Sequence, residues 1–153
     1  MSTLLQRKTK RIRAMTKKFS QDLFDKNDYA KELVVNYLRS RDYDAWVNPD
    51  KYGIDVYAEK DENFFEIEVE VKHNWKGQKF PYEAVHFSER KRKFIKPSKL
   101  NIFWMLNDDW SWALLIDGLQ MSEAPVIVKD TIYTTAERFI AVPIAQATLL
   151  RMK

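Results

Sequence analysis

The chain has 153 residues, enough for one domain with its own core, and its 45% hydrophobic content and three glycines exclude intrinsic disorder and fibrous repeats. It contains no cysteine and only two histidines, which excludes disulfides, thiolate zinc sites and cysteine nucleophiles and leaves hard, oxygen-bound metal ions. With no apolar run near the roughly 20 residues that span a bilayer and no secretory signal pattern, we expect a cytoplasmic protein without membrane association.

The net charge of +4 is unevenly distributed, because a basic N-terminal arm precedes a mildly acidic body. Residues 1–18 contain no acid, whereas residues 19–153 carry −3, since 19 Lys and Arg face 22 Asp and Glu there. We assign residues 1–26 to this arm, whose apolar spacing favours an amphipathic helix, and expect it to contact nucleic acid, since neutralised phosphates release counterions. A solvated helix face or a disordered tail is the alternative. The arm's cations are Arg7, Lys8, Lys10, Arg11, Arg13, Lys17 and Lys18.

Residues 27–153 are predicted to form one α/β domain with a mixed central sheet flanked by helices. Asp28 is the expected N-cap of the first helix, residues 60–63 form a hairpin turn, and Ser88 is a second expected N-cap. In chain order, the expected elements are a helix over 29–41, strands over 43–47, 54–58 and 64–72, a short helix over 88–95, strands over 101–106, 111–116, 126–128 and 139–142, and a helical turn over 145–152.

The third predicted strand carries the chemistry, because its polar and apolar residues alternate without a break and strand side chains point to opposite faces with period two. One face is apolar and directed to the core: Phe65, Ile67, Val69 and Val71. The other face is charged: Glu66, Glu68, Glu70 and Lys72. Three carboxylates on one face repel one another unless a cation or solvent relieves them. A solvated charged face is therefore the alternative to a functional site.

Asp55 lies in the preceding strand, so the hairpin can bring its carboxylate beside Glu70. Two converging carboxylates form a minimal Mg²⁺ site, because this ion takes oxygen ligands and is completed by water and phosphate oxygens. Lys72, two residues from Glu70 on the same face, is then positioned to stabilise charge on a phosphate during hydrolysis. The pattern predicts metal-dependent cleavage of phosphodiester bonds.

The segment Tyr52-Gly53-Ile54-Asp55-Val56 followed by Glu70-Val71-Lys72 resembles the PD-(D/E)XK nuclease superfamily. The resemblance implies a restriction-endonuclease-like or resolvase-like αβββαβ core, with Asp55, Glu70 and Lys72 as catalytic residues. It also implies that the Val71 carbonyl joins Asp55 and Glu70 as a metal ligand, and it makes Glu32 and Glu68 possible additional acids. Ile54 stands where the motif has proline, with Pro49 placed earlier in the chain.

Two further groups of cations are predicted to contact nucleic acid. Lys76 and Lys79 are mixed with aromatic residues after the predicted strand, a pattern compatible with gripping a backbone, although loop anchoring is the alternative. The short predicted helix over 88–95 adds a basic face, for which the alternative is solvation; its cations are Arg90, Lys91, Arg92 and Lys93.

The leading hypothesis is a Mg²⁺-dependent endonuclease acting on DNA, with Mn²⁺ as a substitute metal and RNA as a second possible substrate. A resolvase, a homing or restriction-like nuclease, and a phage accessory nuclease all fit it. We expect a homodimer or higher homo-oligomer, because cutting two strands needs two sites and a chain this short holds one. The alternatives are a non-catalytic nucleic-acid-binding module that retains the fold, and a partner-binding protein with a basic arm.

Overall fold

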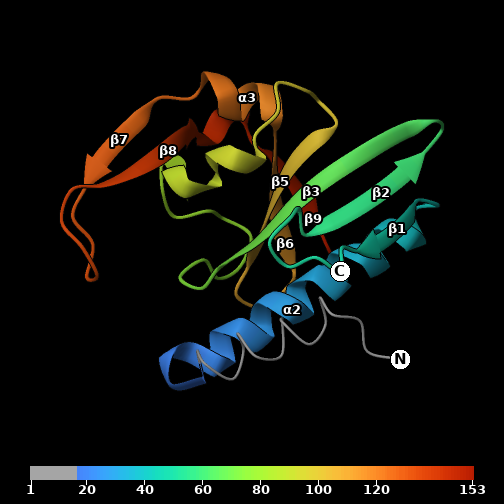
Figure 1. Cartoon of the computed structure of the whole chain (residues 1–153), viewed down its shortest axis with the longest axis horizontal. Helices are drawn as coiled ribbons and strands as arrows, with labels where there is room; N and C mark the ends of the chain where they lie inside the picture. Colours follow the sequence, from blue (N-terminus) through green and yellow to red (C-terminus); the bar gives the residue numbers. More distant parts are fainter. Residues whose placement is uncertain (1–16) are drawn as a thin grey trace.

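A computed structural model describes residues 17–153 of the chain (Figure 1). The first described element is the helix α2 (Lys17–Ser40). It runs through the expected boundary at 29, so Asp28 lies inside a helix and the prediction of an N-cap there is wrong. The physical reason is that no Gly or Pro interrupts residues 17–40. The arm cations from Arg7 to Arg13 lie outside the described residues.

A six-stranded mixed sheet forms the centre of the molecule, in the order β1-β2-β3-β5-β6-β9. Neighbouring strands are antiparallel except for β3 and β5, which are parallel. The mixed α/β class is therefore confirmed. The strands of this sheet are β1 (Asp44–Val47), β2 (Val56–Lys60), β3 (Asn63–Lys72), β5 (Asn101–Asn107), β6 (Trp112–Asp117) and β9 (Thr148–Arg151).

The hairpin between β2 and β3 is confirmed, with Lys60 paired to Asn63 across it. The two residues between them, Asp61 and Glu62, have φ angles of 52° and 67°. Two consecutive positive φ values are what a two-residue type I′ turn requires, and this turn matches the right-handed twist of the strands. The turn fixes the register of β3 and therefore which of its residues face which side.

A second, three-stranded sheet in the order β4-β8-β7 was not expected as a unit. The strands predicted over 126–128 and 139–142 are confirmed as β7 (Val126–Lys129) and β8 (Glu137–Pro143), and β4 (Ala84–Ser88) joins them. The expected helix after Ser88 is the 3₁₀ helix η1 (Glu89–Phe94), capped by the Ser88 hydroxyl.

The end of the chain corrects a further expectation, because residues 145–152 are not a terminal helix. A 3₁₀ turn, η2 (Ile144–Gln146), leads into β9, which pairs with β6 at the sheet edge. The short helix α3 (Gly118–Glu123) was also missed; Asp117 caps it with a reciprocal bond to Gln120. Among the described residues, no helix is long and apolar enough to cross a membrane.

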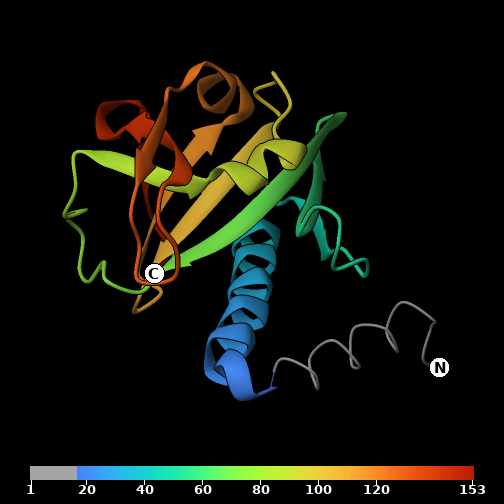
Figure 2. The same ribbon diagram turned by 60° about the vertical axis from the view of Figure 1, so that its left-hand side comes forward.

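The main sheet is covered differently on its two faces (Figures 1 and 2). One face packs against α2 in a core that includes Val34, Ile67 and Leu106. The opposite face packs against the second sheet and α3 in a core that includes Phe87, Phe103 and Met121. The expectation of helices as the flanking layers holds for α2, whereas a small sheet supplies most of the other layer.

Candidate active site

The charged face of β3 turns toward the second-sheet side of the molecule, and it is not a solvated face. The apolar residues Ile67, Val69 and Val71 belong to the core beneath α2, so by strand alternation the intervening Glu68 and Glu70 point the other way. The Glu68 side chain is only 4% exposed. Burial of a carboxylate costs free energy unless the group is paired or hydrogen-bonded, so the contacts of Glu68 indicate how its burial is tolerated.

Backbone amides of β3 and of the loop before Asp55 hold this residue at the charged face of β3. Its Oδ2 accepts a hydrogen bond of 2.8 Å from the Val69 amide of β3. Its carbonyl oxygen accepts a 2.9 Å bond from the Asn48 amide, and the Asn48 side chain donates to the carbonyl of Ile54. A side chain on Gly53 would approach Asn48 Nδ2 at 2.9 Å, which explains a glycine in this tight loop. The loop therefore fixes the Asp55 carboxylate against β3.

Asp55 and Glu68 form a close acidic pair that two lysines partly neutralise. Lys31 Nζ of α2 lies 3.3 Å from Asp55 Oδ1, and Lys91 Nζ of η1 lies 3.0 Å from Glu68 Oε2. Burial and, to a smaller extent, the neighbouring Asp55 raise the pKa of Glu68 to about 7, against the opposing effect of Lys91. A carboxyl with a pKa near neutrality is common at functional sites.

Glu70 lies next on the same face and is less completely paired. Its Oε2 atom is buried and has no hydrogen-bond partner. Burial raises the pKa of Glu70; Lys91 and Lys72 oppose this rise, whereas Asp55 adds to it. Glu68 Oε1 is likewise buried without a partner. Two orphaned carboxylate oxygens therefore lie on one face of one strand.

Lys72, at the end of β3, is half-buried beside these acids. Its Nζ lies 5.4 Å from the centre of the Tyr82 ring. Burial lowers the pKa of Lys72 and the nearby Lys129 lowers it further, while Glu70 acts in the opposite direction. The structure thus places Asp55, Glu70 and Lys72 near one another, together with Glu68, which the sequence gave as a possible additional acid.

The donor set fits a hard divalent cation of the Mg²⁺ type. No three Asp, Glu or His side chains form a ready-made metal cluster among the residues whose side chains the structure describes. However, Mg²⁺ is commonly held by one or two carboxylates, with water and phosphate oxygens completing its shell. The unpartnered Glu70 Oε2, with Asp55 nearby, supplies such a partial set.

The remaining acid and ligand candidates are placed less favourably. Glu32 is exposed on α2, and its neighbour Lys31 reaches the site instead. The Val71 side chain lies in the core beneath α2, so only its carbonyl oxygen is available as a ligand. Sequence reasoning missed Lys31, although it precedes Val34, Val35 and Leu38 at the i+3, i+4 and i+7 spacing of a buried stripe.

The cations expected to contact nucleic acid divide into two groups. Lys76, Lys79, Arg92 and Lys93 are exposed, as phosphate contacts require. Lys91 instead points inward to Glu68 and forms part of the carboxylate cluster. Trp75 and Phe80, near Lys76 and Lys79 in the sequence, are buried against each other in the core, so these two rings anchor their loop.

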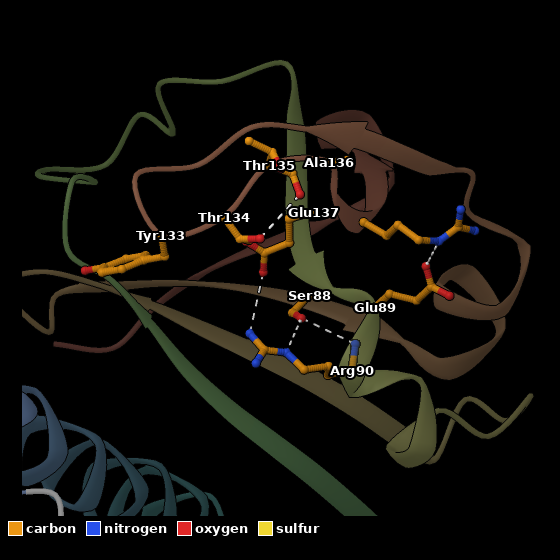
Figure 3. Close-up of a pocket in the computed structure, with 9 residues that line it drawn as sticks. Ser88, Glu89, Arg90, Tyr133, Thr134, Thr135, Ala136 and Glu137 are labelled. Atoms are coloured by element: carbon orange, nitrogen blue, oxygen red, sulfur yellow. Dashed lines mark hydrogen bonds and ion pairs between the residues drawn. The ribbon is translucent and has the colours of Figure 1, made fainter.

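A pocket of about 920 Å³ opens beside η1, between this helix and the loop that joins β7 to β8 (Figure 3). Arg90 projects along it with an 86% exposed side chain, and its guanidinium lies 3.5 Å from Glu137 Oε1. Tyr133, 79% exposed, stands at its rim. Because Lys91 follows Arg90 in η1, one short element lines the pocket and also contacts the carboxylate cluster.

Comparison of the chain with protein-family models and with curated proteins gives no match.

Proposed function

We propose that the chain is a Mg²⁺-dependent endonuclease that hydrolyses phosphodiester bonds in DNA. The observation that carries this proposal is the arrangement on one face of β3: Glu70 keeps a buried oxygen without a partner, with the carboxylate of Asp55 and the ammonium of Lys72 close by. Glu70 and Asp55 are the proposed metal ligands, together with the Val71 carbonyl.

Without a bound cation, the carboxylate cluster of Asp55, Glu68 and Glu70 is energetically unfavourable. Burial opposes the ionised form of Glu68 and Glu70, and Asp55 opposes it further. A divalent cation relieves this repulsion and, when bound, supplies Lewis-acid activation of water and phosphate. Lys72 contributes a preorganised positive charge where negative charge develops on the phosphate oxygens. Glu68 modulates the site through its hydrogen bond with Lys91.

The chain order supports the same proposal. The helix α2 is followed by three antiparallel strands, a crossover that includes η1, and a strand parallel to β3. This is the order of helix, three strands, helix and strand that the resemblance to PD-(D/E)XK nucleases implies. The differences are that the crossover helix is a six-residue 3₁₀ helix and that β4 precedes it.

The exposed cations Lys76, Lys79, Arg92 and Lys93 and the N-terminal arm are the proposed contacts to the DNA backbone, and a homo-oligomer is the proposed form that cuts both strands. The alternative function is a non-catalytic nucleic-acid-binding module. The ion pairs of Lys31 and Lys91 with the carboxylates favour this alternative, because internal cations also reduce the acidic repulsion.

A metal-dependent cleavage assay separates these two functions. Supercoiled, linear and branched DNA are incubated with the protein in Mg²⁺, Mn²⁺, Ca²⁺ or excess chelator. We expect nicking or cutting in Mg²⁺ and Mn²⁺, and binding without cleavage in Ca²⁺, whose looser coordination activates water less well. Cleavage that persists in chelator would contradict the metal mechanism, and binding without cleavage under every condition would favour the non-catalytic module.

A further inference from the structure

A second cluster of charged side chains lies near Lys72, and it is basic. His86 of β4 and Lys129 of β7 meet beside Phe139 of β8, which lies between these two strands. His86 Nδ1 is 2.8 Å from Lys129 Nζ, and Lys129 Nζ is 4.6 Å from the centre of the Phe139 ring. The second sheet therefore brings two basic groups together from strands that are not paired.

Lys72 of the main sheet interacts with the same two groups. Burial lowers the pKa of His86, and Lys129 and Lys72 lower it further. Lys129 and Lys72 therefore both lie near the His86 ring. This basic cluster (Lys72, His86 and Lys129) joins the two sheets.

None of the three side chains forms an ion pair with an acid among residues 26–153. Lys129 is paired with Glu137 in the β7–β8 ladder, but the Glu137 carboxylate is engaged by Arg90 and Thr131 instead. Lys129 Nζ donates one of its three N–H bonds to His86 Nδ1, so N–H donors of both side chains remain for an anion. The cluster is therefore suited to an anion with several oxygen acceptors.

The basic cluster is also continuous with the pocket beside η1. Ser88 lies two residues from His86 along β4, and Glu137 lies two residues from Phe139 along β8, so each pair shares a strand face. Ser88 and Glu137 both line the pocket (Figure 3). A path of side chains thus leads from Glu70 and Lys72 on β3, through the basic cluster, to this pocket. A polyanionic chain fits such a path better than a single small anion.

We infer that His86 and Lys129, which lie near Lys72, bind a backbone phosphate of the nucleic-acid substrate adjacent to the phosphate that is cut. This inference rests on the proposed function and extends its site from β3 to the second sheet. The carboxylates of β3 hold the metal ion, whereas the basic cluster positions the nucleic-acid strand. His86 and Lys129 are therefore positioning residues for the substrate, with Lys129 as the principal contact because it is exposed.

The test measures binding of a labelled DNA duplex in Ca²⁺ across a salt series. Lys129→Ala should weaken binding roughly tenfold, as expected for loss of one hydrogen bond to a charged group. It should also reduce the slope of log K against log salt by about 0.9. Lys129→Arg should restore most of the affinity, and His86→Gln should have a smaller effect of the same kind. Lys153→Ala, which removes an exposed cation at the chain end, is the control and should bind like the parent.

A neutral methylphosphonate, placed at one phosphate at a time, identifies the contact. A methylphosphonate next to the scissile phosphate should lower the DNA affinity of the parent protein to that of Lys129→Ala. The affinity of Lys129→Ala should not fall further on this modified DNA. A parental salt slope for Lys129→Ala, or an unchanged effect of this substitution at every methylphosphonate position, would overturn the inference. Because the salt-series measurement needs no cleavage, a parent that never cuts would refute the proposed function alone. A parent that cuts while Lys129→Ala binds normally would refute only the inference.

Discussion

The two faces of β3 differ in what they contribute to the protein. The face toward α2 presents Ile67, Val69 and Val71 to an apolar core, where burial stabilises the fold. The opposite face, made by the alternating residues of the same strand, buries Glu68 and part of Glu70 against Lys91 and Asp55. Burial on the first face therefore stabilises the fold, whereas burial of carboxylates on the second face costs free energy.

Residues that stabilise the fold and residues proposed for catalysis therefore alternate along β3. They lie on opposite faces of the strand rather than in distant parts of the molecule. Neighbouring residues such as Val69 and Glu70 should respond to substitution in opposite ways. Changes on the α2 side should lower the free energy of unfolding and leave the chemical step intact. Changes on the carboxylate side should alter the chemical step and leave the fold intact or make it more stable.

The largest expected effect is on the carboxylate side, at Glu70. Glu70→Gln keeps the size of the side chain but removes a proposed metal ligand, so single-turnover cleavage in Mg²⁺ should fall by a factor on the order of 10²–10³. Thermal melting should show no loss of stability. Glu123→Gln, an exposed acid on α3, is the matched control and should cut like the parent. A Glu70→Gln protein that cuts at the parental rate would remove Glu70 from the site.

A smaller effect is expected in the pH dependence of stability. The pKa of Glu68 is about 7 in the folded chain and 4.5 ordinarily, so the folded state holds a proton that the unfolded state releases between these values. The free energy of unfolding should therefore fall as pH rises through this window, by an amount on the order of 2–3 kcal/mol.

Thermal melts at pH 5 and pH 8 in excess chelator measure this difference. Glu68→Gln should show a smaller difference than the parent, because the variant has no carboxyl to ionise there, whereas the exposed Glu59→Gln on β2 should match the parent. Equal pH dependence for Glu68→Gln and the parent would show that Glu68 does not carry this charge cost.

The smallest expected effect is on the α2 side of β3. Ile67→Val removes one buried methylene and should lower the free energy of unfolding by about 1 kcal/mol. The cleavage rate per folded molecule should stay at the parental value, because Ile67 faces away from the carboxylates. Denaturant melts and single-turnover cleavage on the same preparation test both statements. A loss of cleavage without a loss of stability would contradict the separation of the two faces.

Much of the fold around the site followed from local patterns. The alternation along β3 and the turn at Asp61 and Glu62 specify a hairpin whose register places Asp55 beside Glu68. These features depend on residues close in the sequence. The same alternation says which side chains share a face, but it does not say what covers that face. The burial of Glu68 depends on η1 and the second sheet, whose pairing is not local.

The unexpected elements have the same physical origin. The local pattern of residues 148–151 also fits a helix. They form β9 instead, because pairing with β6 at the edge of the sheet stabilises a strand there. Lys91 was expected to contact nucleic acid with its basic neighbours, yet the buried Glu68 attracts it inward. The position of Asp55 beside the charged face of β3 was therefore predictable from spacing, whereas the ion pairs of Lys31 with Asp55 and of Lys91 with Glu68 were not.

Substitution of Lys72 decides whether the charged face of β3 catalyses cleavage. Single-turnover cleavage in Mg²⁺ is measured for Lys72→Ala beside DNA binding in Ca²⁺, with Lys60→Ala, a half-buried lysine at the far end of β2, as the control. If Lys72 stabilises charge that develops only in the transition state, its loss should lower the rate on the order of 10²–10³-fold, while binding changes far less. A Lys72→Ala protein that cuts at the parental rate would contradict this assignment of the active site.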